Sequence, residues 1–156
     1  MNALNTVAAT SLLALSALLF SCKDDDNNNP TIPVDNTDTF GATLNGAQQI
    51  PVVSTTATGA YSASFDKTSK VLNYTVTYQG LTPTMGHIHS VTAATAEGNT
   101  GAVSVPFAAT LTTPLIGQAT LTQAQQDEMY ANRTYANLHT AAYPDGEIRG
   151  NIKKTD

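Results

Sequence analysis

Hydrophobic and polar residues alternate with a period of two along most of the chain after residue 39. Leu72, Tyr74 and Val76, for example, fall on one face of an extended segment whose intervening positions are polar. This alternation is typical of a β-strand with one buried face. It predicts strands at 40–44, 61–65, 72–78, 86–91, 102–107, 116–121, 135–140 and 147–152. Eight short strands predict an all-β sandwich or barrel.

Turn and capping signals connect these strands. The polar run 66–70 predicts a hairpin turn, and Tyr143-Pro144-Asp145-Gly146 predicts a tight reversal before the last strand. Thr122 is a good N-cap, and Gln125 three residues later fits a capping box. We therefore expect one short crossover helix over 123–132.

The N-terminus carries an apolar run, 7–20, that is too short to span a bilayer and has the length of a signal-peptide core. It ends at Ser21-Cys22, which resembles the lipobox of bacterial lipoproteins, where a small residue precedes the lipidated cysteine. We expect residues 1–21 to be the signal peptide and Cys22 to anchor the protein to a membrane through lipid. The alternative is a buried N-terminal helix with a core cysteine, which a run without a polar face disfavours.

A polar segment follows the cysteine, and we expect residues 22–38 to be a disordered tether and residues 39–156 to be the β domain. Its first residues, Lys23, Asp24 and Asp25, resemble the signal that sends lipoproteins of the Bacteroidetes to the outer face of the outer membrane. The expected location is therefore extracytoplasmic, at the outer membrane or cell surface. The alternative for these three residues is a solvated spacer.

Charge excludes one class of partner. The formal net charge is -5, and the segment 22–38 holds five acidic residues against one lysine, so the remaining domain is nearly neutral. Only 12% of the residues are charged, which suits a soluble β-rich module. Without clustered lysine and arginine, the domain lacks the electrostatic footprint that nucleic-acid binding requires.

Three histidines are the strongest candidates for chemistry. His87 and His89 are two residues apart on one predicted strand, so they share a face, and His139 lies on another predicted strand. If these strands are neighbours, three imidazoles converge and could bind zinc or copper with a coordination position left open. The alternative is that each ring packs under a turn and hydrogen-bonds to loop backbone.

Two acidic residues could add a carboxylate to such a site. We expect instead that Asp145 shapes the turn with Gly146, and that Glu147 pairs with its same-face neighbour Arg149. The chain has no Gly-x-Ser-x-Gly elbow and no phosphate loop, and its single cysteine, Cys22, would be consumed by lipid. This absence of a complete catalytic constellation favours a non-enzymatic protein over an enzyme.

Several motifs occur in a fixed order after the tether. They are 44–51 (LNGAQQIP), 57–59 (ATG), 72–81 (LNYTVTYQGL), 86–89 (GHIH), 135–140 (YANLHT) and 144–150 (PDGEIRG). Together they resemble the CHRD (chordin-type) domain family, found in animal growth-factor antagonists and singly in secreted microbial proteins. The resemblance implies an immunoglobulin-like β-barrel with limited similarity to copper/zinc superoxide dismutases, whose paired strand histidines bind copper. It implies no activity, and this chain lacks the histidine-rich zinc loop and the disulfide cysteines of the dismutases.

Two hypotheses of different classes follow. The first is a surface-anchored, non-enzymatic interaction module whose partner is an unknown protein or glycan. The second is a metalloprotein that holds zinc or copper, structural or redox-active, at His87, His89 and His139.

Overall fold

Antiparallel strands are the main secondary structure of the computed structural model, which describes residues 36–92 and 96–156. In these residues the strands are β1 (Thr37–Asn45), β2 (Thr58–Asp66), β3 (Val71–Gln79), β4 (Met85–Ser90), β5 (Ala102–Pro106), β6 (Leu115–Thr120), β7 (Thr134–His139), β8 (Ile148–Asn151) and β9 (Lys153–Lys154). A short 3-10 turn, η1 (Gly46–Gln48), and one α-helix, α1 (Gln123–Tyr130), complete them. The prediction of an all-β domain with a single short helix is confirmed.

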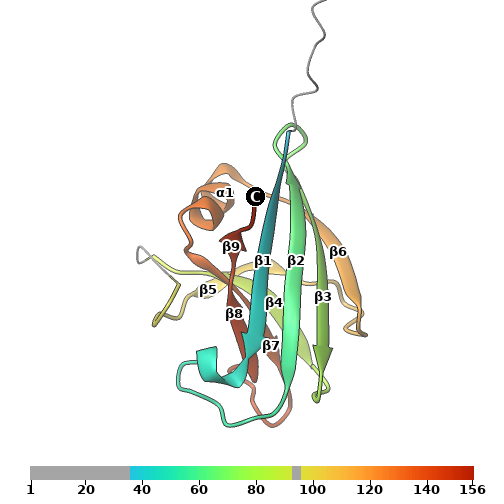
Figure 1. Cartoon of the computed structure of the whole chain (residues 1–156), viewed down its shortest axis with the longest axis vertical. Coiled ribbons are helices and arrows are strands. Elements are labelled where there is room, and N and C mark those ends of the chain that lie inside the picture. Colours follow the sequence, from blue (N-terminus) through green and yellow to red (C-terminus); the bar gives the residue numbers. More distant parts are fainter. Residues whose placement is uncertain (1–35, 93–95) are drawn as a thin grey trace, which may run out of the picture. The chain divides into compact units, whose positions relative to one another are not determined.

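The strands form one nearly closed, barrel-like sheet in the order β5-β4-β7-β8-β1-β2-β3-β6, with β9 paired to β1. All of the pairings are antiparallel. The β1-β2-β3-β6 half and the β5-β4-β7-β8 half enclose the core between them (Figure 1). The hairpin predicted between residues 61 and 78 is β2-β3, with Asp66 paired to Val71.

Inward side chains of both halves form a single hydrophobic core, as period-two alternation requires. Three aromatic rings lie at its centre, with Tyr61 and Tyr74 each within 6.5 Å, centroid to centroid, of Phe107. From the strands that matter for the site, the core receives Ile88, Ala136 and Leu138, each at most 3% exposed. The alternate residues of those strands therefore face outward.

Helix α1 connects β6 to β7 and begins at the predicted capping box. The Thr122 hydroxyl accepts from the Gln125 backbone, and the Gln125 side chain accepts from the Thr122 backbone. The helix ends at Tyr130, two residues earlier than predicted, and Asn132 adopts a left-handed φ of 57°. Met129 enters the core. No helix in the described part of the chain is long and apolar enough to cross a membrane.

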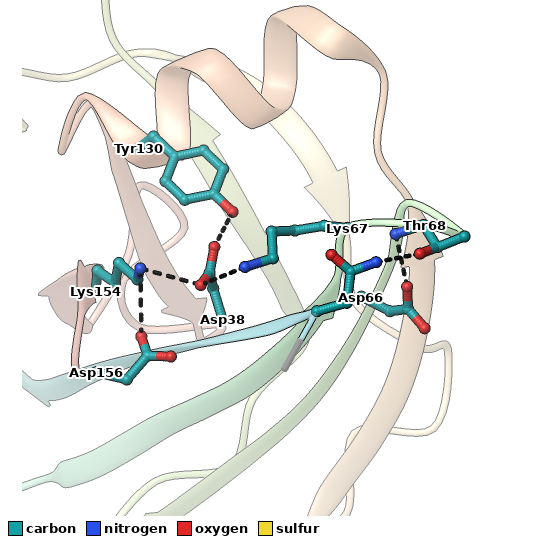
Figure 2. Close-up of polar contacts among 8 residues, drawn as sticks. Asp38, Asp66, Lys67, Thr68, Tyr130, Lys154 and Asp156 are labelled. Carbon is teal, nitrogen blue, oxygen red and sulfur yellow. Dashed lines mark hydrogen bonds and ion pairs between the residues drawn. The ribbon is translucent and has the colours of Figure 1, made fainter. Parts of the chain in front are cut away.

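Strand β1 begins at Thr37, so the last two residues assigned to the tether belong to the domain. The pattern missed this start because Asp38 occupies an inward position, where a polar residue hides the alternation. Its carboxylate is held by Tyr130, Lys67 and Lys154 (Figure 2). The predicted signal peptide, Cys22 and the Lys23-Asp24-Asp25 signal lie outside the described residues.

Candidate metal centre

The register between β4 and β7 brings the three histidines together. Met85 pairs with His139, His87 with Asn137 and His89 with Tyr135, all on the outward face. The two strands are direct neighbours in the sheet, as the site hypothesis required. Residues on this face are nevertheless largely covered, because all six residues of β7 are buried.

The ring nitrogens approach metal-binding distances. His87 Nδ1 and His139 Nε2 are 3.4 Å apart, and one ligand nitrogen from each of the three rings lies within 4.8 Å of the others. Two nitrogens bound tetrahedrally to one zinc or copper ion, at about 2.0–2.1 Å each, lie about 3.3 Å apart. The pair His87–His139 already has this spacing.

Backbone carbonyls fix which nitrogen of two rings faces the cluster. His89 Nδ1 lies 3.0 Å from the Gly101 carbonyl oxygen, and His139 Nδ1 lies 2.8 Å from that of Pro144. A carbonyl can only accept, so both Nδ1 atoms carry the proton and both Nε2 atoms present a bare lone pair. Histidine ligands of metals are oriented by this kind of second hydrogen bond. The backbone contacts of the alternative hypothesis are therefore present; they leave His89 Nε2 unpaired and His139 Nε2 as the acceptor for His87 Nδ1–H.

The Nε2 atom of His89 is buried and has no hydrogen-bond partner among the described residues. Leaving a buried acceptor unpaired costs about 1–3 kcal/mol. His89 is 8% exposed and His139 6%, whereas His87 is half-buried. The cluster thus has a buried floor of two imidazoles and an accessible rim at His87.

Burial and mutual repulsion favour neutral imidazoles. Burial lowers the pKa of His87, and a charge on His139 would lower it further. Burial also lowers the pKa of His89, and this effect exceeds the opposing effect of the hydrogen bond that His89 donates to the Gly101 carbonyl. Neutral imidazole is the form that binds metal ions, so the lowered pKa values of His87 and His89 favour the binding-competent form.

The two acidic residues do not join the cluster. Glu147 is buried, and its carboxylate accepts hydrogen bonds from the hydroxyl groups of Thr55 and Thr140, both at 2.8 Å. Asp145 is exposed in the turn, where Gly146 N–H donates to the Tyr143 carbonyl, as the turn prediction required. The metal-type cluster in the described residues contains histidines alone.

The expected ion pair between Glu147 and Arg149 is wrong. The Arg149 guanidinium lies 3.5 Å above the Tyr135 ring and donates to the Ala96 carbonyl. Arg149 is 1% exposed, and the Glu147 carboxylate accepts its hydrogen bonds from the two threonine hydroxyls instead. The sequence did not predict a second contact of Tyr135 either: the His89 ring packs parallel to the Tyr135 ring, with the ring centroids 4.8 Å apart. A His89-Tyr135-Arg149 stack therefore holds His89 in place.

A second support lies under the turn that positions His139. Gly146 has a φ of +119°, and a Cβ there would lie 2.5 Å from the Asn137 amide and 2.6 Å from that of Gln49. Gln49 donates to Asn137 at 2.6 Å, which links the chain after η1 to the centre of β7. Sequence reasoning missed this contact, because it joins residues 88 positions apart.

An antiparallel β-barrel with an outward histidine cluster defines the general class of this domain. Comparison with protein families makes it specific: the CHRD domain matches residues 40–152. The match spans most of the chain, and the protein belongs to the CHRD domain family. No curated protein and no solved structure gave a significant match.

Proposed function

We propose that this CHRD domain binds a zinc or copper ion at His87, His89 and His139. The carrying observation is that backbone carbonyls hold the Nδ1 protons of His89 and His139, which leaves a lone pair on each Nε2: that of His139 lies 3.4 Å from His87 Nδ1, and that of His89 is buried without a partner among the described residues. Three imidazoles without a carboxylate suit zinc and copper better than magnesium or calcium. The half-buried His87 leaves one coordination position accessible to solvent or to a fourth ligand.

The test is metal binding by the full chain, purified in detergent with a histidine-free tag. We expect one Zn²⁺ or Cu²⁺ ion per chain by elemental analysis. His89→Ala and His139→Ala should each weaken binding by at least about 100-fold, since removing even a residue that orients a ligand costs 10–100-fold. An ion present at about 100 times its Kd should raise the free energy of unfolding by about 2.7 kcal/mol.

Two variants make the outcome decisive. Glu147→Gln keeps the shape of the neighbouring carboxylate and should bind metal as the parent does, because Glu147 is held by Thr55 and Thr140. The triple His→Ala variant should fold but take up no ion. Unfolding of the triple variant in metal-free buffer, with no metal uptake by the parent, would assign the histidines a purely structural role.

A second candidate function, that of a binding module, is favoured by the outer face of β1, β2, β3 and β6. The register places side chains there in three rows whose residues on these four strands are uncharged; the row beyond Thr39 holds Asp66, and Lys153 of β9 pairs with Gly41. The rows are Thr39, Ser64, Asn73 and Gln118; Gly41, Ser62, Thr75 and Ile116; and Thr43, Ala60 and Thr77. Two hollows of about 590 and 370 Å³ open on this face.

The chemistry of the three rows fits an uncharged glycan, because their hydroxyl and amide groups can exchange hydrogen bonds with sugar hydroxyls and the rows themselves present no charge on β1, β2, β3 and β6. Binding to immobilised neutral polysaccharides should then change little between about 0.05 and 0.5 M salt. Ser62→Arg, at the centre of the rows, should abolish it, while Thr120→Arg at the end of β6 should not. Preference for anionic polysaccharides, or binding that salt abolishes, would contradict the proposal.

We further propose that lipid at Cys22 displays the domain outside the cytoplasm, at the outer membrane or cell surface. The apolar run before Cys22 and the polar residues after it support this. Membrane fractionation and labelling of intact cells, described below, test the anchor and its orientation separately.

A further inference from the structure

One sulfur-bearing residue lies on the same face as the three histidines and has no role in the core. Met85, His87 and His89 occupy positions i, i+2 and i+4 of β4, and the rings of His87 and His89 are 5.5 Å apart, as same-face neighbours should be. The β4-β7 pairing is regular through this segment, since the bulge between Ile88 and His89 affects the pairing with β5. The alternation therefore continues to Met85.

Met85 is also the cross-strand partner of His139. Directly opposed residues in an antiparallel pair have Cβ atoms about 4.5–5.5 Å apart on the same face. Met85 and His87 line one hollow of about 170 Å³, together with Phe107 and Leu111. The Met85 side chain is thus a neighbour of His87 and His139.

The rim is where a fourth ligand could approach. His89 and His139 are buried beneath loops, so the open side of the cluster is the side of the half-buried His87. Met85 is 46% exposed and has three rotatable bonds beyond its Cα, so its thioether can swing toward the cluster without disturbing the core. A single exposed apolar residue is ordinary by itself, and it is the position beside two ligands that distinguishes Met85.

We propose that Met85 Sδ is a fourth ligand that makes the three-histidine site selective for monovalent copper. This inference rests on the proposed metal site. Thioether sulfur is a soft ligand that selects Cu(I), whereas imidazole nitrogen accepts zinc and both copper states. Zn²⁺ would be held by the three histidines and water, with little contribution from sulfur. The cargo or cofactor of the site is then copper, accepted in its reduced state.

The experiment compares Cu(I) and Zn²⁺ affinities of the full chain, measured anaerobically by competition with chromophoric chelators. Met85→Leu keeps the apolar volume and removes the sulfur. It should weaken Cu(I) binding by about 10-fold or more and leave Zn²⁺ binding within about 2-fold, since a lost ligand costs at least as much as a lost orienting partner. Ile116→Leu, at an exposed position of β6 in the other half of the sheet, is the control and should change neither affinity.

X-ray absorption at the copper edge supplies a readout that a structural effect would not mimic. The Cu(I)-loaded parent should show one sulfur scatterer at about 2.3 Å, the usual metal–sulfur distance, and the Met85→Leu protein should show none. Copper(I) bound equally well by both proteins, or equal losses of Cu(I) and Zn²⁺, would overturn the assignment of Met85 and leave the histidine site standing. Failure of the parent to bind either ion would instead overturn the site itself.

Discussion

Removing the charge of Asp38 tests whether this carboxylate locks the start of β1 to α1, the β2-β3 turn and β9. The Asp38 carboxylate accepts a hydrogen bond from Tyr130 Oη and lies 3.2 Å from Lys67 Nζ and 3.0 Å from Lys154 Nζ (Figure 2). These partners come from α1, the β2-β3 turn and β9. Asp38→Asn retains the shape of the side chain and removes its charge.

The pKa of Asp38 gives the size of the stability loss expected for Asp38→Asn. The hydrogen bond from Tyr130, followed by the contact with Lys154, lowers this pKa from 3.8 to about 2. A carboxyl with that difference between folded and unfolded states stabilises the fold by about 2 kcal/mol at neutral pH. The two lysine side chains are 37% and 43% exposed, so solvent screening reduces the expected loss to about 1–2 kcal/mol. For a domain of this size, that is a fall of about 4–8 °C in Tm.

The pH dependence has a definite sign. Because the folded pKa lies below the unfolded one, the contribution is complete above about pH 4 and is lost as the pH falls toward 2. Urea unfolding of parent and Asp38→Asn should therefore differ at pH 7 and converge near pH 2. Asp127→Asn, at an exposed position of α1, is the matched control and should lie within about 0.5 kcal/mol of the parent at each pH. A difference between parent and Asp38→Asn that persists unchanged at pH 2 would refute an electrostatic origin.

Three further changes probe the turn, the anchor and the tether. Gly146→Ala, which forces a Cβ against the Asn137 amide at positive φ, should lower the free energy of unfolding by at least about 2 kcal/mol; parent-like urea unfolding would contradict this. Cys22→Ala should move the protein from the membrane to the soluble fraction, whereas recovery in membranes with an intact N-terminus would indicate an uncleaved helix. In a Bacteroidetes host, alanine at 23–25 should abolish antibody labelling of intact cells with lipidation unchanged, and unaltered labelling would reduce the segment to a spacer.

Local signals carried the parts of the fold that could be predicted from sequence. Period-two alternation marks every long strand, because each has one face in the core and one face outward. The capping box of α1 and the turn before β8 are also encoded within a few residues, so Thr122 and Gln125 were assigned their contacts correctly. The sandwich-or-barrel class followed from the number and spacing of such segments.

Contacts between distant segments account for the errors. The sequence pattern assigns Asp38 to the polar tether, because its partners are far along the chain. Lys154, which forms an ion pair with it, lies 116 residues further on, and Tyr130, which donates a hydrogen bond to it, lies 92 residues further on. Glu147 and Arg149 are sequence neighbours of opposite charge, yet each has its partner elsewhere. Thr55, 92 positions away, donates a hydrogen bond to Glu147. The Arg149 guanidinium stacks on the Tyr135 ring and donates to the Ala96 carbonyl.

The histidine cluster combines both kinds of information. The β4-β7 register is fixed by the inner face, where Ile88 and Leu138 are buried, and a shift by one residue would move those side chains out of the core. The same register places His87, His89 and His139 outward, so the core rather than a metal ion brings the rings together. The loops then select the nitrogen, through carbonyls that no spacing rule could identify. Sequence could therefore name three residues that converge but not the ring nitrogens that face one another, and if an ion binds, we expect it to find the rings already assembled.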